Sequence, residues 1–75
     1  MSENIQIRLV ELTQHWNEHD PVSAIQQKRA HDLGVALNEF GGKDEMLSAY
    51  YRAKAFNRCA SVLQYYWDGI GDWRA

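Results

Sequence analysis

Apolar residues recur at helical spacing along most of this chain, and the pattern is strongest in residues 44–68. There the apolar positions form two stripes at steps of three and four, about 120° apart round a helix. The first stripe holds Ala49, Ala53, Phe56, Ala60, Leu63 and Trp67, and the second holds Tyr51, Ala55, Cys59, Val62 and Tyr66. We predict one long helix from Asp44 to Asp68, with more apolar surface than a helix covered from one side shows.

Two amphipathic stretches precede this helix. Apolar residues at i, i+4, i+7 and i+11 predict a first helix from Asn4 to Glu18. Asp20 suits an N-cap and Pro21 suits the first helical position, so a second helix is predicted from Pro21 to Phe40. Its inward residues should be Val22, Ile25, Leu33, Ala36 and Phe40.

Two glycines mark the boundary between the second and third predicted helices. Gly41 and Gly42 should end the second helix, with Gly41 at positive φ, and leave a loop of about three or four residues before an Asp44 cap. So short a loop predicts antiparallel neighbours. Gly34 lies inside the second helix, where it costs up to about 1 kcal/mol relative to alanine, and this suggests a close backbone contact.

The chain ends in the sequence W-D-G-I-G-D-W, residues 67–73. Gly69 can close the preceding helix in the left-handed conformation, and Ile70 can then fold back onto its last turn. Gly71 allows a second reversal that returns Trp73 to the bundle. The resulting expectation for residues 1–75 is a single all-α domain, a three-helix bundle with a long third helix and an ordered C-terminal turn.

Composition argues against membrane, secreted and strongly basic nucleic-acid-binding proteins. The chain has 75 residues, eight basic and ten acidic, and a net charge of −2. It has no polybasic run, no apolar run of membrane-spanning length and no signal-peptide pattern. Cys59 is the lone cysteine, which excludes an internal disulfide and favours a cytoplasmic protein.

Gly41-Gly42, Met46, Ala49-Tyr50 and the W-D-G-I-G-D-W ending together resemble a set of small uncharacterised bacterial all-helical proteins. The resemblance covers roughly the C-terminal half of the chain. It implies a bacterial helical protein and carries no activity, cofactor or catalytic residue.

An exposed apolar seam on the third helix is the first candidate site. If the bundle covers only one stripe, the other remains open to a partner chain. The interface candidates are Tyr51, Ala55, Val62, Tyr66 and Trp73. The alternative is that the first helix covers this stripe and the whole of it is core.

Arg29 and Arg52 are the second candidate site, because each falls within or between apolar stripes. Two converging arginines would bind an anion. The ordinary alternatives are ion pairs with nearby carboxylates, or aliphatic stems that lie on apolar surface with exposed tips.

His15 and His19 have the i,i+4 spacing that can chelate a metal on a helix, but no completing motif follows them, so no metal or cofactor is expected. No catalytic signature is present, and catalysis is the less favoured class. We therefore expect a non-catalytic interaction module that forms a homodimer through the third helix. A small-molecule or anion-binding protein is the alternative. DNA binding is the weaker alternative, because the domain is acidic.

Overall fold

The fold, in a computed structural model, is built from helices. The structure describes residues 2–71 and 73, with side chains for 4–71 and 73. Its elements are α1 (Ser2–Thr13), α2 (Ala24–Phe56), the 3-10 helix η1 (Arg58–Val62) and α3 (Leu63–Tyr66). Residues 2–71 and 73 contain no strand, which confirms the all-α prediction.

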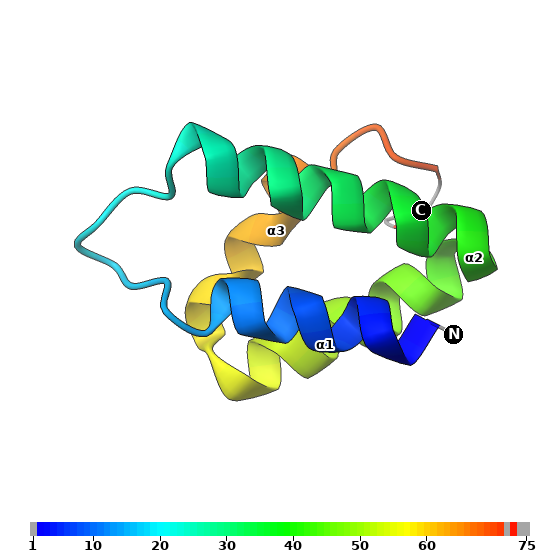
Figure 1. The fold of residues 1–75 in the computed structure, drawn as a ribbon, viewed down its shortest axis with the longest axis horizontal. Helices are drawn as coiled ribbons and strands as arrows, with labels where there is room; N and C mark the ends of the chain where they lie inside the picture. Colours follow the sequence, from blue (N-terminus) through cyan, green and yellow to red (C-terminus); the bar gives the residue numbers. More distant parts are fainter. Residues whose placement is uncertain (1, 72, 74–75) are drawn as a thin grey trace.

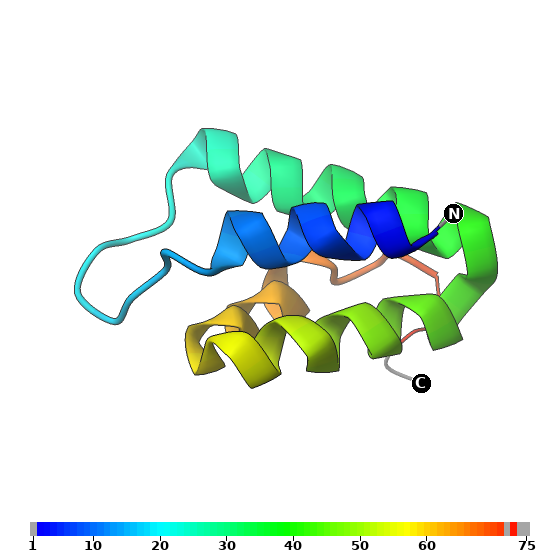
Figure 2. The ribbon, with the colours of Figure 1, turned by 60° about the horizontal axis from the view of Figure 1, so that its bottom comes forward.

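Helix α2 is folded into a hairpin at Gly42. This residue has φ 71° and ψ −153°, a conformation that is essentially restricted to glycine. It separates an N-arm (residues 24–41) from a C-arm (residues 43–56), and the two arms run antiparallel with α1 lying against both (Figures 1 and 2). The predicted break and the antiparallel arrangement are confirmed. The break is shorter than predicted, and the positive φ belongs to Gly42 instead of Gly41.

The loop that joins α1 to α2 starts earlier and ends later than predicted. Helix α1 stops at Thr13, and α2 begins at Ala24, where the Ser23 hydroxyl accepts a hydrogen bond from the Gln26 amide at 3.2 Å. Asp20 is therefore not the cap. Within the loop, Asn17 Oδ1 accepts from the amides of His19 and Asp20, both at 2.8 Å. This asparagine turn competes with continuation of the helix.

The long third helix is not present, because the helix ends at Phe56 and the chain turns at Asn57. Asn57 has φ −152° and ψ 111°, an extended conformation between α2 and η1. Its Nδ2 donates to the carbonyls of Thr13 and Trp16, both at 2.8 Å, and its Oδ1 accepts from the Cys59 amide at 3.1 Å. One side chain thus caps η1 and also holds the end of α1. Asparagine favours such capping positions over helix interiors.

The turn at Asn57 sends the C-terminal segment back across the bundle, where Trp67 becomes the largest fully buried side chain. A Cβ built on Gly34 would lie 2.5 Å from Trp67 Nε1, so the indole occupies the space that a side chain would need. Trp67 Nε1 donates to the Ala30 carbonyl at 2.7 Å. Because Cβ atoms tilt toward the helix N-terminus, the missing Cβ of Gly34 uncovers this carbonyl one turn earlier. The predicted backbone contact at Gly34 is confirmed.

The described part of the C-terminal turn packs against the core, as predicted. Gly69 and Gly71 have φ of 87° and 56°. Ile70 is buried, and Trp73 is 4% exposed, with its Nε1 donating to the Trp67 carbonyl at 3.0 Å. The turn therefore closes the core over Trp67.

The predicted inward face of the second helix is wrong at its ends, where Ile25 and Phe40 are exposed. The buried face of the N-arm instead holds Ala30, Gly34 and Leu37. Ala30 and Gly34 lie where the returning Trp67 packs, so small residues occupy that part of the buried face.

Candidate functional site

A groove of about 870 Å³ lies between the loop that joins α1 to α2 and the segment that follows the Asn57 turn. We call it the loop groove; the loop is the extended cyan segment in Figure 1. Its lining comprises Trp16, Asn17, Glu18, His19, Asp20, Pro21, Val22, Gln27, Lys54, Arg58, Cys59, Ser61, Val62 and Tyr66. The lining therefore comes from two stretches of the chain, residues 16–27 and 54–66, and the Asn57 side chain ties them together.

The base of the loop groove is apolar and aromatic. Trp16 is its buried member, 7% exposed, and Val22, Cys59, Val62 and Tyr66 are half-buried beside it. The Trp16 and Tyr66 rings meet edge to face, with centroids 5.9 Å apart and planes at 87°. This arrangement offers flat apolar surface to a ligand.

Trp16 also carries an unpartnered donor. Among the described residues, its Nε1 is the one buried side-chain nitrogen or oxygen without a hydrogen-bond partner. The other two indole nitrogens, of Trp67 and Trp73, each donate to a carbonyl. Buried polar groups are normally paired, so an unpaired one calls for an explanation. Because this nitrogen is itself buried, an acceptor in the loop groove would reach it only once the ring or its neighbours move.

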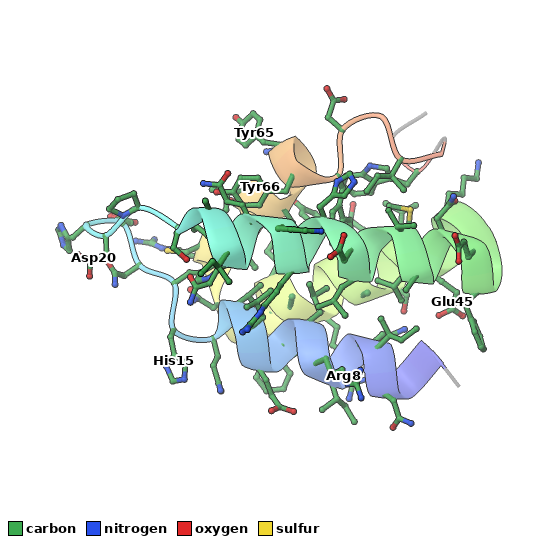
Figure 3. All side chains as sticks on the ribbon, turned by 45° about the horizontal axis from the view of Figure 1, so that its top comes forward. Arg8, His15, Asp20, Glu45, Tyr65 and Tyr66 are labelled. Carbon is green, nitrogen blue, oxygen red and sulfur yellow. The ribbon has the colours of Figure 1, made fainter. Side chains whose placement is uncertain are left out.

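Tyr66 is the second group at the base. Burial raises the pKa of its phenol above the usual 10.0. The hydroxyl is a donor at neutral pH, as any phenol is. Its carbonyl lies 2.9 Å from His31 Nδ1, which fixes the end of α3 against the N-arm. Figure 3 shows the neighbouring Tyr65 pointing away from the bundle.

Charged side chains form the rim of the loop groove. Arg58 Nη2 and Glu18 Oε1 are 2.8 Å apart, and their side chains are both exposed. Lys54 Nζ lies 5.7 Å from the centroid of the Tyr50 ring. Asp20, at the outer end of the loop in Figure 3, accepts from Asn17 Nδ2 at 3.2 Å. The rim thus presents both signs of charge above an apolar base.

The predicted interface stripe is divided by the Asn57 turn. Tyr51 and Ala55 are exposed on the C-arm, whereas Val62 and Tyr66 are half-buried in the loop groove. Trp73 is buried in the core, as predicted for the C-terminal turn, so it does not offer the surface that an interface candidate needs. The argument for a continuous exposed seam on one helix therefore fails, because the helix that would carry it ends at Phe56.

Arg29 and Arg52 are both exposed and are not brought together. Arg52 Nη1 donates to Gln6 Oε1 of α1 at 3.3 Å. Arg29 lines a second, more open groove of about 530 Å³ between α1 and the N-arm. Two buried arginines that converge on one anion are not found, and exposed tips on apolar stems describe both residues better.

The two candidate histidines do not share a helical face, because α1 ends at Thr13, before His15. His15 projects outward in Figure 3, and His19 lies in the loop. Among the described residues, no group of three or more histidine, cysteine, aspartate or glutamate side chains is placed to hold a metal ion.

Comparisons with protein-family models, with curated proteins and with solved structures found no match. The site must therefore be interpreted from its own chemistry. Within the described part of the chain, no helix has both the length and the hydropathy that a bilayer crossing requires.

Sequence reasoning missed Trp16 as a site residue, and it considered Lys54 and Arg58 only as cations for the weaker DNA-binding alternative. Trp16 was assigned to the core of a longer first helix. The signal that could have identified the site is Asn57, a strong capping residue in the middle of a predicted helix. A turn there brings Arg58 to the loop after α1.

Proposed function

We propose that this chain is a non-catalytic binding module that takes its ligand in the loop groove. The observation that supports the proposal most is Trp16, whose buried Nε1 has no partner among the described residues although the residue lines the groove. An apolar recess with a few polar groups is the usual form of a small-ligand site. Binding requires only the apolar contact and the hydrogen-bond donors that this groove offers.

The three tryptophan indoles allow a direct test of this proposal. We expect small aromatic and aliphatic acids, amides and alcohols, screened individually by ¹H–¹⁵N correlation NMR, to include compounds that move the Trp16 indole cross-peak. The indole peaks of Trp67 and Trp73 serve as internal controls, because both groups already donate to carbonyls in the core. Single tryptophan-to-phenylalanine variants assign the three peaks.

Saturable movement of the Trp16 peak alone would support the proposal. If no compound moves that peak, or if all three indole peaks move together as in partial unfolding, the proposed site is wrong.

Self-association is a second candidate function, and exposed aromatic residues on the C-arm favour it. Tyr51 is 60% exposed and Phe56 is 70% exposed, and Ala55 lies one helical turn after Tyr51. Exposed tyrosine and phenylalanine are typical of protein interfaces. The surface differs from the long predicted stripe, since it is confined to one arm of the α2 hairpin.

Sedimentation equilibrium at high micromolar concentration checks this second candidate. We expect a dimer for the native chain and a monomer for the double variant Tyr51→Ser, Phe56→Ser. Tyr65→Ser is the control, because Tyr65 is 70% exposed on α3, away from the C-arm. A native chain that stays strictly monomeric would remove the dimer from consideration.

A further inference from the structure

Two cationic side chains belong to the lining of the loop groove. Lys54 is in the last turn of α2 and Arg58 is the first residue of η1, so the Asn57 turn lies between them. Both line the loop groove together with the aromatic pair at its base. Cations beside an apolar recess match a molecule that has an apolar body and an anionic end.

Lys54 has its charge available for a ligand. Among the described residues, no carboxylate lies within ion-pairing distance of it, since the two ion pairs found join Lys28 to Asp32 and Arg58 to Glu18. The ammonium lies 5.7 Å from the Tyr50 ring centroid, which restrains the side chain through a cation–π contact.

Arg58 is already held by a carboxylate, and that contact is exchangeable. The Glu18 and Arg58 side chains are 63% and 84% exposed, and exposed ion pairs contribute little to stability. A ligand carboxylate can therefore replace Glu18 at the guanidinium without a large loss of stability. The pair also shows that the guanidinium can accept a carboxylate at the edge of the groove.

We infer that the loop groove binds a small amphipathic carboxylate, such as an arylalkanoic acid. Its apolar body packs on Trp16 and Tyr66, and its carboxylate lies between Lys54 and Arg58. This inference rests on the proposed function and adds the chemical class of the ligand.

Glu18 and Asp20 are the acidic groups that line the loop groove, and they set a limit on affinity. Asp20 already accepts from the Asn17 amide, and Glu18 is neutralised by Arg58 in the unbound protein. Once the ligand carboxylate pairs with Arg58, the released Glu18 carboxylate repels the ligand. Removal of the Glu18 charge should therefore tighten binding, whereas removal of either rim cation should weaken it.

Two probes of nearly equal shape and different charge provide the test: 3-phenylpropionate and 3-phenylpropionamide. Each is titrated at neutral pH while the Trp16 indole peak is followed by NMR. We expect the carboxylate to bind at least about ten-fold more tightly than the amide, since a lost charge contact commonly costs that much. Added salt should reduce the difference.

Four single variants test which charged side chains act on the bound carboxylate. Lys54→Gln and Arg58→Gln should each weaken 3-phenylpropionate binding by about five-fold or more, and Glu18→Gln should strengthen it several-fold. Lys28→Gln is the matched control, because Lys28 pairs with Asp32 on the N-arm and does not line the groove. Circular dichroism checks that each variant is folded.

The outcomes separate this inference from the proposed function. Equal binding of acid and amide at Trp16, or an unchanged affinity in Glu18→Gln, would overturn the carboxylate assignment and leave the binding groove in place. Failure of both probes, while other screened compounds still move the Trp16 peak, would also reject the carboxylate. Failure of every compound would reject both proposals.

Discussion

Replacing Gly34 with alanine should lower the free energy of unfolding by about 2–3 kcal/mol, although alanine is the better helix former. The added Cβ would meet Trp67 Nε1, Cδ1 and Cε2 at 2.5, 2.6 and 2.9 Å. The indole is fully buried and cannot move away without losing its hydrogen bond to the Ala30 carbonyl. Urea denaturation measures the loss, and the melting temperature should fall by about 10–20 °C.

Gly41→Ala is the matched control, since Gly41 is also a glycine within α2. Its added Cβ would meet only the Glu45 side chain, nearest at Cγ, and this side chain can turn aside if it gives up its 3.3 Å contact with Gln6 Nε2. We expect a loss below about 1 kcal/mol there, because helix propensity favours alanine and offsets part of the lost contact. If Gly34→Ala is as stable as Gly41→Ala, Trp67 does not pack where the structure places it.

Replacing Asn57 with aspartate should lower the free energy of unfolding by about 2–4 kcal/mol at neutral pH. The change keeps the size of the side chain and the oxygen that accepts from the Cys59 amide. It removes the donor to the Thr13 and Trp16 carbonyls and places a negative charge against both oxygens. The destabilisation should show in chemical unfolding followed by circular dichroism.

This deficit should depend on pH in a defined direction. Because the folded protein disfavours a negative charge at this position, the pKa of the introduced carboxyl should rise above its usual value of about 3.9 on folding. Stability is then recovered as pH falls toward that value and the group becomes a neutral donor. A deficit that stays constant from pH 7 to pH 4 would contradict the hydrogen bonds assigned to Asn57.

Asn17→Asp provides the same chemical change at an exposed position. Asn17 uses its oxygen to accept from the His19 and Asp20 amides, and aspartate keeps both bonds. It loses the exposed donation to Asp20 and sets two carboxylates beside each other in solvent, where repulsion is weak. We expect a loss below about 1 kcal/mol, as for other exposed polar contacts.

Predictions that depended on glycine were the most successful. Gly42 and Gly69 have positive φ near two predicted boundaries, and Gly34 has the predicted backbone contact. These are local constraints: a missing Cβ either permits a backbone conformation or leaves room for a neighbour. They can be inferred without knowing the rest of the fold.

The apolar pattern gives no sign of the helix break at Asn57. Ala60, Leu63 and Trp67 are buried as the stripe predicted, but they belong to η1, α3 and the turn that follows. The same residues reach the core after a change of direction, so their periodicity continues across the break. Phe56, just before the turn, is the stripe residue that becomes exposed.

The loop groove could not be located from the sequence, because its walls come from two distant stretches of chain whose approach depends on the early end of α1. With α1 extended to Glu18, Trp16 becomes a helix-core residue and the loop that forms one wall of the groove is lost. The bond from Asn57 to the Thr13 carbonyl decides this geometry, and it joins residues 44 positions apart. Periodicity carries no information about such a contact.

The central claim is that Asn57 turns the chain back and places Trp67 on Gly34, and a nuclear Overhauser spectrum tests it most directly. The account predicts strong cross-peaks between the Trp67 indole protons and the Gly34 Hα protons. An uninterrupted third helix, antiparallel to the second, would carry Trp67 past Gly34 to the start of that helix. Absence of the Gly34 cross-peaks, together with helical chemical shifts at Asn57, would contradict the account.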